Sequence, residues 1–170
     1  MSKKKAFVVG SNTSASLSPT IFQYWFDKYN INAEYGYIEI KKENFKNEIK
    51  KILKEESLCG LNITTPFKEK IIPHLTSLDS EAEISGAVNC VIKTKNSLRG
   101  TNTDGLGFLN ALLAKEIKGS KNWLKKTNKV AVIVGFGGAA KSIIKSLKKT
   151  GFEKIYVFNR DYEKIWNASM

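Results

Sequence analysis

The chain divides at Gly100-Thr101-Asn102-Thr103-Asp104-Gly105-Leu106-Gly107-Phe108, since the residues before and after this stretch show two different α/β patterns. Leucines recur at helical spacing from residue 106 to residue 113, which predicts a helix that begins at the junction. Asp104 lies where a short carboxylate accepts hydrogen bonds from the first backbone N–H groups of that helix. Two roles for Asp104 are therefore open: a helix cap, or a catalytic carboxylate facing a cleft between two domains.

The composition is that of a folded globular protein. Its 170 residues are 42% apolar and 11% aromatic and contain no low-complexity run. No apolar run approaches the roughly 20 residues of a membrane-spanning helix, and the one near the N-terminus is too short for a signal peptide. The two cysteines, Cys59 and Cys90, lie in apolar, strand-like surroundings without metal-ligand spacing, which predicts buried free thiols and no metal site. We therefore expect a cytoplasmic protein.

The positive charge is concentrated in the second half. The net charge is +12; residues 1–104 hold 15 basic and 12 acidic residues, whereas residues 105–170 hold 13 and 4. A basic chain raises the question of nucleic-acid binding, but the lysines between residues 115 and 129 surround a single aromatic residue, Trp123, and no known nucleic-acid module. A solvated lysine-rich surface, or attraction of an anionic cofactor, explains the charge without a nucleic acid.

The first half alternates strands and helices. Strands are predicted at residues 5–10, 34–40 and 58–63, with a helix that begins at Ser18 and another around residues 45–53. This order is typical of a parallel sheet covered by helices. Two sets of apolar residues recur at helical spacing and are predicted to pack on the sheet: Ile21, Phe22, Trp25, Phe26 and Tyr29, and then Phe45, Ile49, Ile52 and Leu53.

A loop rich in hydroxyl groups follows the first strand. Ser14 and Ser16 lie in it, and the next helix begins with Ser18 as N-cap and Pro19 in the first helical position. Capping accounts for Ser18 but not for the other two serines. Hydroxyl and backbone N–H groups that meet at a helix N-terminus suit a carboxylate or a phosphate.

A lysine follows the third strand in an unusual place. In Thr64-Thr65-Pro66-Phe67-Lys68, Thr65 is predicted to cap a helix that Pro66 starts, so Lys68 lies in the first turn, where the helix dipole disfavours a cation. Either the Lys68 side chain reaches out to water, or its pKa is lowered and its amine points into a cleft at the carboxyl end of the strand.

Two further polar residues stand in apolar surroundings. Asn89 interrupts a predicted apolar strand, so its amide needs hydrogen-bond partners, which backbone groups can supply. The lone His74 follows Pro73 without a partner motif and is expected to be structural or exposed. Asn96-Ser97 predicts a hairpin turn just before the junction.

The second half opens with a phosphate-loop pattern. An apolar strand at residues 129–134, predicted to be buried, runs directly into Gly135-Phe136-Gly137-Gly138-Ala139-Ala140 and a helix. In this Gly-x-Gly-x-x-Ala pattern Gly135 permits a tight turn and Gly137 lets the backbone approach a pyrophosphate. Ala140 lets the helix pack closely on the strand.

The end of the next strand bears on the choice of cofactor. After the strand at residues 155–158, Asn159-Arg160 stands where an NAD-binding protein usually places an acid for the ribose diol. Arginine suits the 2′-phosphate of NADP, and Lys164, one helical turn later, would complete a clamp with Asn159 and Arg160. Asp161 keeps NAD as an alternative cofactor, since its carboxylate would bind the ribose diol if the turn shifted.

Four motifs, taken in order, resemble those of the shikimate dehydrogenase family, which includes quinate/shikimate dehydrogenases. They are Ser16-Leu17-Ser18-Pro19, Gly60-Leu61-Asn62-Ile63-Thr64-Thr65-Pro66-Phe67-Lys68, Gly86-Ala87-Val88-Asn89 and Asn102-Thr103-Asp104-Gly105. The chain departs from the family pattern at Leu17, usually lysine, at Phe22, usually histidine, and at Asp161, usually threonine.

The resemblance implies a role for each motif. Lys68 would donate a proton, oriented by Asp104, during the reduction of 3-dehydroshikimate to shikimate by NADPH. Ser16 and Ser18 would hold the substrate carboxylate. The substrate-binding residues would be Ser16, Ser18, Thr64, Asn89 and Asp104. The cofactor-binding residues would be Gly135, Gly137, Gly138, Ala139, Ala140, Asn159, Arg160 and Lys164.

The predicted fold class is α/β. A three-layer α/β substrate domain, residues 1–104, precedes the first part of a Rossmann NADP-binding domain, residues 105–170, with a junction helix at about residues 105–118. The expected partners are shikimate and 3-dehydroshikimate, without nucleic acid or membrane, and the expected oligomeric state is a monomer or homodimer.

The second half offers only two strands for a cofactor domain that needs several. We therefore expect a C-terminally truncated shikimate dehydrogenase with little or no activity alone. Two alternatives remain: a shikimate-binding module that is weak or inactive in catalysis, and a quinate/shikimate dehydrogenase that uses NAD.

Overall fold

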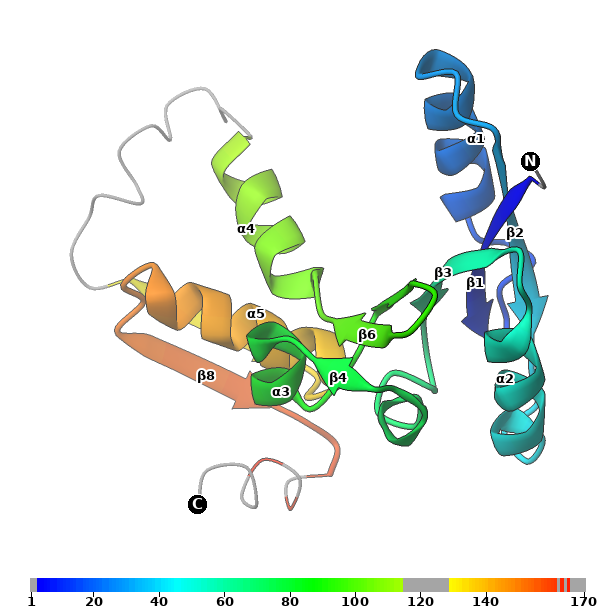
Figure 1. Ribbon diagram of the computed structural model, residues 1–170. Coiled ribbons are helices and arrows are strands. Elements are labelled where there is room, and N and C mark those ends of the chain that lie inside the picture. The colour runs from blue at the N-terminus through cyan, green and yellow to red at the C-terminus, as the bar shows by residue number, and fades with distance from the viewer. Residues whose placement is uncertain (1–2, 115–128, 162, 164, 166–170) are drawn as a thin grey trace. The chain divides into compact units, whose positions relative to one another are not determined.

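The computed structural model describes residues 3–114, 129–161, 163 and 165 (Figure 1). The chain forms two compact units, Met1–Thr101 and Asn102–Met170. Each unit has its own sheet, so each is described by itself.

The first unit contains a six-stranded sheet. Its strands are β1 (Lys4–Gly10), β2 (Ala33–Glu39), β3 (Leu58–Ile63), β4 (Ser77–Leu78), β5 (Cys90–Lys93) and β6 (Leu98–Thr101). The strand order is β2-β1-β3-β5-β6-β4. β1 is parallel to β2 and β3, as predicted, but β5 is antiparallel to both β3 and β6. The sheet is mixed because the hairpin predicted at Asn96-Ser97 joins β5 and β6 directly, and a short turn can join only antiparallel strands.

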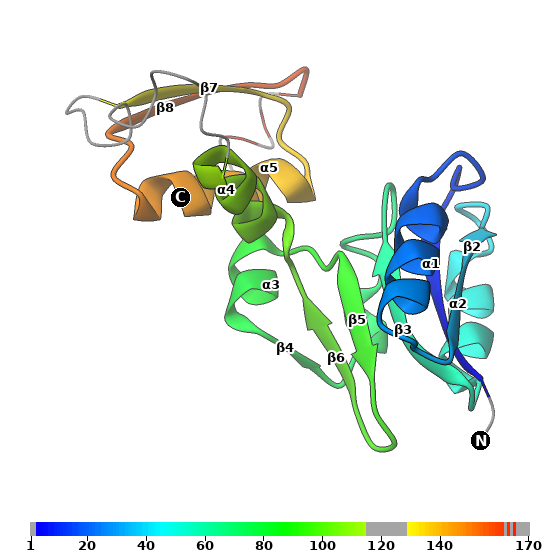
Figure 2. The same cartoon turned by 90° about the horizontal axis from the view of Figure 1, so that it is seen from above.

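Helices cover both faces of the parallel part of this sheet, which gives three layers (Figure 2). Val8 and Val9, which point to opposite faces of β1, are both buried. Val9 packs in one core with Phe45, Ile49 and Leu53 of α2 (Phe45–Lys54), so the predicted α2 stripe is confirmed. The opposite face, which carries Val8, is covered by α1 (Ser18–Lys28).

The predicted apolar stripe of α1 is only half correct. Phe22 and Phe26 are half-buried, whereas Ile21, Trp25 and Tyr29 are exposed. α1 packs mainly on β2, and β2 is the edge strand of the sheet. A helix on an edge strand has no further strand beneath its outer side, so only part of its apolar surface is covered.

The helix predicted at Pro66 is absent. The Thr65–Pro66 peptide bond is cis, and the chain makes a series of turns up to a short 3₁₀ helix, η1 (Ile72–His74), before α3 (Ser80–Ser85). Pro73 also disfavours a helix here, because proline lacks a backbone N–H and restricts the residue before it. The buried Phe67 side chain holds this segment on the core by stacking on Phe45, with ring centroids 4.2 Å apart.

The second unit consists of α4 (Asp104–Ala114), β7 (Val130–Val134), α5 (Gly138–Lys149) and β8 (Lys154–Phe158). β7 and β8 pair in parallel, and both helices lie on one side of this pair (Figure 2). The other face carries exposed apolar side chains, with Val132 63% and Val134 86% exposed, so the prediction of a fully buried strand is wrong. Residues 115–118 of the predicted junction helix, the lysines from 115 to 126 and Trp123 lie outside the described residues.

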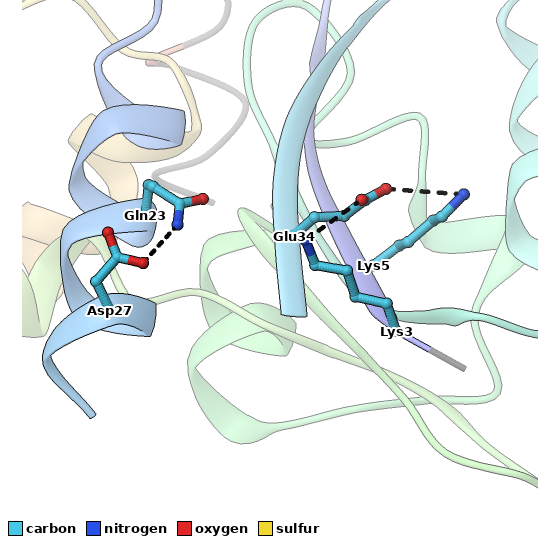
Figure 3. Close-up of polar contacts among 5 residues, drawn as sticks. All are labelled: Lys3, Lys5, Gln23, Asp27 and Glu34. Atoms are coloured by element: carbon cyan, nitrogen blue, oxygen red, sulfur yellow. Dashed lines mark hydrogen bonds and ion pairs between the residues drawn. The ribbon is translucent and has the colours of Figure 1, made fainter. Parts of the chain in front are cut away.

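Exposed polar contacts lie where β1 and β2 begin (Figure 3). Glu34 of β2 is 3.9 Å from the Lys3 amine and 3.7 Å from the Lys5 amine. On α1, Gln23 donates a hydrogen bond of 2.8 Å to Asp27. Such exposed pairs contribute little to stability, so the core rather than these contacts holds the strands together.

Within the described residues, no helix combines the length and apolar character needed to cross a membrane. In the same part of the chain, no three His, Cys, Asp or Glu side chains are grouped to hold a metal ion. Both cysteines are free thiols, but Cys59 is exposed and Cys90 half-buried, so the prediction that they are buried is wrong for Cys59.

Candidate active site

The first three motifs meet at the carboxyl ends of β1 and β3. Backbone hydrogen bonds tie the second motif to β1 and to the third motif: Thr64 N–H donates to the Val9 carbonyl oxygen (2.9 Å), and Ile63 N–H donates to the Asn89 carbonyl oxygen (2.8 Å). Val88 N–H donates to the Lys68 carbonyl oxygen at 2.8 Å, which places the lysine segment beside the Asn89 segment. Binding sites of parallel α/β sheets lie at this edge.

The serine loop is anchored to the end of β2. The Glu39 carboxylate accepts hydrogen bonds from Thr13 N–H and Ser14 N–H, both at 2.8 Å. These bonds, with one from the Ser14 hydroxyl, hold the pKa of Glu39 below its ordinary value. Thr13 is buried, and its hydroxyl donates to the Ile38 carbonyl oxygen at 3.2 Å.

A close approach at Gly10 places the serine loop against Thr64. A Cβ atom on Gly10 would lie 2.5 Å from the Thr64 methyl carbon and 2.7 Å from that of Thr13. Only glycine leaves room for both threonines, so Gly10 helps to bring the first two motifs together. The sequence offered a signal for this, since a glycine at a strand end often marks a close backbone approach.

Ser16, rather than Ser18, accepts a hydrogen bond at the start of α1. α1 begins at Ser18 with Leu17 in the N-cap position and no side-chain cap, so the prediction of Ser18 as N-cap is wrong. The Ser16 hydroxyl oxygen accepts from Ser18 N–H at 3.2 Å. Leu17 is in a helical conformation instead of the extended one that a capping side chain requires.

Tyr35 and Asn62 belong to the same polar cluster, although sequence reasoning did not assign them a role. The Tyr35 hydroxyl donates to Asn62 Oδ1 at 2.6 Å, and Asn62 Nδ2 donates to the Asn89 carbonyl oxygen at 3.4 Å. Burial raises the pKa of Tyr35 well above its ordinary value, while a hydrogen bond with Ser18 acts in the opposite direction. A tyrosine in a buried strand needs a partner for its hydroxyl, and that was the available signal.

Lys68 and Asn89 flank this cluster. Lys68 is half-buried and lies in a turn, so the helix-dipole argument made for it from sequence no longer applies. Asn89 is half-buried, and its backbone N–H donates to Thr101 at 3.1 Å.

Asp104 opens α4 in the second unit. The side chain of Asn102, which is 2% exposed, accepts a hydrogen bond from Asp104 N–H at 3.0 Å. Asn102 thus accepts a backbone hydrogen bond at the start of this helix, whereas the sequence analysis considered only Asp104 as its cap. Gly105 N–H donates to the Ser142 hydroxyl at 3.0 Å, which ties the same turn to α5.

The glycine loop makes a tight turn between β7 and α5. Gly135 has φ 101°, which glycine adopts readily and other residues do not, and its N–H donates to Phe158 at 2.7 Å. Gly137 is the N-cap residue of α5, and a Cβ on it would meet no atom within 4 Å. Gly138, Ala139 and Ala140 form the first turn, whose backbone N–H groups suit a phosphate.

The residues predicted to bind the adenosine ribose follow β8. Asn159 Nδ2 donates to the Asp161 carbonyl oxygen at 2.7 Å, which closes the turn and leaves Arg160 and Asp161 exposed. Lys164 lies outside the described residues.

A hollow of about 560 Å³ lies away from these motifs, at the amino ends of β1 and β3. Its lining residues are Lys4, Lys54, Glu56, Leu58, Cys59, Lys93, Thr94 and Lys95. It contains none of the residues of the four motifs.

Comparison with known proteins identifies relatives of both parts of the chain. Residues 8–91 match the family described as shikimate dehydrogenase substrate binding domain, and residues 113–169 match shikimate / quinate 5-dehydrogenase. A shikimate dehydrogenase (NADP(+)) of Pelagibacter ubique is 44% identical over 158 residues, which are 93% of this chain and 57% of that protein. The chain thus spans little more than half the length of that relative.

Solved structures agree with this assignment. Shikimate dehydrogenase from Aquifex aeolicus superimposes with a TM-score of 0.84 at 30% identity, over 98% of this chain and 59% of that one. Shikimate 5-dehydrogenase from Thermus thermophilus, in complex with NADP(H) and shikimate, gives a TM-score of 0.83 at 29% identity, over 98% and 59%. The α/β substrate-binding unit, the start of a Rossmann unit and the two family matches lead to one conclusion: this chain belongs to the shikimate dehydrogenase family.

Proposed function

We propose that this chain binds shikimate and 3-dehydroshikimate and takes part in their NADP-dependent interconversion. The observation that carries the proposal is the meeting of the serine loop, the Thr64–Lys68 segment and Asn89 at one sheet edge. Hydroxyl, amide and amine groups gathered there match a small polyhydroxylated carboxylate. The family relatives and the structure of a relative with shikimate and NADP(H) support the same ligands.

The proposed chemistry assigns proton transfer to Lys68. NADPH supplies the hydride when bound, and the protonated Lys68 side chain donates a proton to the alkoxide oxygen that forms at the substrate carbonyl. Asp104 binds a substrate hydroxyl. Ser16 and Ser18 donate hydrogen bonds to the substrate carboxylate, and Thr64 and Asn89 bind its hydroxyl groups.

The cofactor residues of this chain suit NADP. The N-terminus of α5, which follows the turn at Gly135 and the N-cap Gly137, offers backbone N–H groups to the pyrophosphate. Arg160, with Asn159 and Lys164, would bind the 2′-phosphate, whereas Asp161 would favour NAD if it read the ribose diol. Comparing the cofactors in Arg160→Ala tests this: loss of NADP preference supports the clamp, and unchanged preference favours Asp161.

A second candidate function is a shikimate-binding module with weak or no catalysis. It is favoured by the location of Ser16, Ser18, Thr64, Lys68 and Asn89, all of which lie in the first unit with its own core. Such a module binds shikimate but reduces no NADP⁺ in its presence, so one pair of measurements separates the two candidates.

Titration of the purified chain with shikimate by calorimetry tests the proposal. Ser16→Ala should weaken binding by roughly ten- to a hundredfold, since a hydrogen bond to a charged group contributes about 1.5–3 kcal/mol. Ser11→Ala is the matched control, because Ser11 is exposed in the same loop and has no proposed role. Equal affinity of Ser16→Ala and Ser11→Ala, or absence of shikimate binding to the unaltered chain, contradicts the proposal.

A further inference from the structure

We propose that a hollow between α2 and η1 is an anion-binding site, suited to a small molecule that carries phosphate groups. The hollow has a volume of about 520 Å³ and lies within the first unit. Four lysines and one glutamate contribute its charged lining: Lys42, Lys46, Lys50, Lys70 and Glu43. No residue of the four motifs lines it, so it is separate from the proposed shikimate site.

The charge of this lining is one-sided. Four amines stand against one carboxylate, and within the described part of the chain none of the four lysines forms an ion pair. Lys46 and Lys50 are four residues apart on α2, so they lie on the same side of the helix and repel each other. Lys46 is also in the first turn of α2, where the helix dipole disfavours a cation. A bound anion would offset both costs.

The histidine to which the sequence assigned no function also lines the hollow. His74 is half-buried, and its ring meets that of Phe45 edge-on, with centroids 6.1 Å apart and planes at 78°. Burial, followed by the charges of Lys50 and Lys46, holds the pKa of His74 below its ordinary value. An anion among the lysines would favour the protonated ring, so His74 would become a fifth cation of the filled site.

The core holds the walls of the hollow in place. Phe45, which is 3% exposed, stacks on the fully buried Phe67 with ring centroids 4.2 Å apart. Ile71, next to Lys70, is fully buried as well. The start of α2 and the segment that carries Lys70 and His74 are therefore fixed to one another before any ligand binds.

The size and charge of the hollow indicate the class of ligand. A volume of about 520 Å³ is typical of sites for small molecules. A phosphate group carries a charge of about −1.5 to −2 at pH 7 and three acceptor oxygens, so two such groups match the four lysines in a small volume. Lysine amines bind phosphate oxygens as compact point charges.

A titration of the purified chain with inorganic pyrophosphate tests this site. The ionic strength is held constant with sodium chloride, and the ring hydrogens of His74 are followed by NMR. His74 is the single histidine of the chain, so its signals report on this hollow even if pyrophosphate also binds at the α5 N-terminus. Pyrophosphate should move these signals to saturation and shift the midpoint of their pH titration to higher pH.

A pair of neighbouring lysines supplies the variant and its control. Lys50→Gln should weaken the pyrophosphate affinity measured at His74 roughly two- to fivefold, as expected for the loss of one exposed ion pair. Lys51→Gln removes the same charge from α2, but Lys51 does not line the hollow, so affinity should be unchanged. Equal losses in both variants, or His74 signals that do not respond to pyrophosphate, overturn the site. Tighter binding of citrate, a polyanion without phosphate, overturns the assignment to phosphate groups.

Discussion

A single carboxylate organises the loop that carries Ser16. Glu39 is exposed, yet it accepts backbone hydrogen bonds from Thr13 and Ser14 at the end of β2. Its contribution comes from holding two N–H donors in place rather than from burial. The loop thus depends on β2, a strand that carries none of the four motifs.

Replacing Glu39 by alanine should loosen the serine loop and weaken shikimate binding. The physical reason is that Thr13 N–H and Ser14 N–H lose their common acceptor. Binding by calorimetry measures the effect. Glu34→Ala is the control, because Glu34 lies at the other end of β2 in an exposed ion pair. An equal loss in both variants contradicts the assignment.

The same carboxylate predicts a pH dependence with a definite sign. The pKa of Glu39 is lowered from 4.5 by the hydrogen bonds that it accepts from Ser14 and Thr13. The bonds are therefore fully present above about pH 4.5 and are lost as the pH falls through the lower pKa of the folded state. Amide chemical shifts of Thr13 and Ser14 should follow this titration in the unaltered chain. Shifts that remain constant in acid would show that Glu39 does not hold the loop.

Sequence reasoning predicted best those elements in which local spacing determines which side chains are buried. The predictions of α2 and β3 were correct. For α2, the charged sequence carries Phe45, Ile49 and Leu53 on one helical face, and packing that face on the sheet is the one way to bury all three. The segment after Thr65 was wrong because a cis peptide bond and the packing of Phe67 on Phe45 depend on tertiary contacts. Tyr35 and Glu39 were missed for the same reason, since their partners lie 27 and 25 or 26 residues away.

The contact between α4 and α5 depends on a glycine. A Cβ atom on Gly105 would lie 2.5 Å from the Ser146 hydroxyl oxygen, and Gly105 is buried. Gly105→Ala should therefore destabilise the second unit by about 1–3 kcal/mol, the range typical of overpacking. Gly107, on the same helix, has no atom within 4 Å of a Cβ. Gly107→Ala should instead be neutral or stabilising by about 0.5–1 kcal/mol, because alanine favours the helix. Thermal unfolding of the two variants measures the difference, and an equal change in both would show that the helices do not pack at Gly105.

The two units differ in how completely their sheets are covered. In the first, helices lie on both faces of β1 and β3, and side chains such as Val9, Leu61 and Ile63 are almost inaccessible to solvent. In the second unit, the described strands β7 and β8 pair only with each other, and alternate residues of both strands are exposed. A pair of strands with one open face is marginally stable by itself, so the stability of this unit rests on α4 and α5.

Amide hydrogen exchange should therefore separate the two units. Strands that open only with global unfolding exchange slowly, whereas a region with few buried contacts opens locally at lower free energy. Amides of β1 and β3 should exchange on the order of a hundredfold or more slowly than those of β7 and β8, which corresponds to about 2.7 kcal/mol or more in opening free energy. The comparison should use residues inside the paired strands, such as Phe7 and Leu61 against Ile133 and Tyr156, so that strand ends do not enter. Equal protection in the two units would mean that β7 and β8 are stabilised by contacts other than those described, and that the open apolar face is covered in solution.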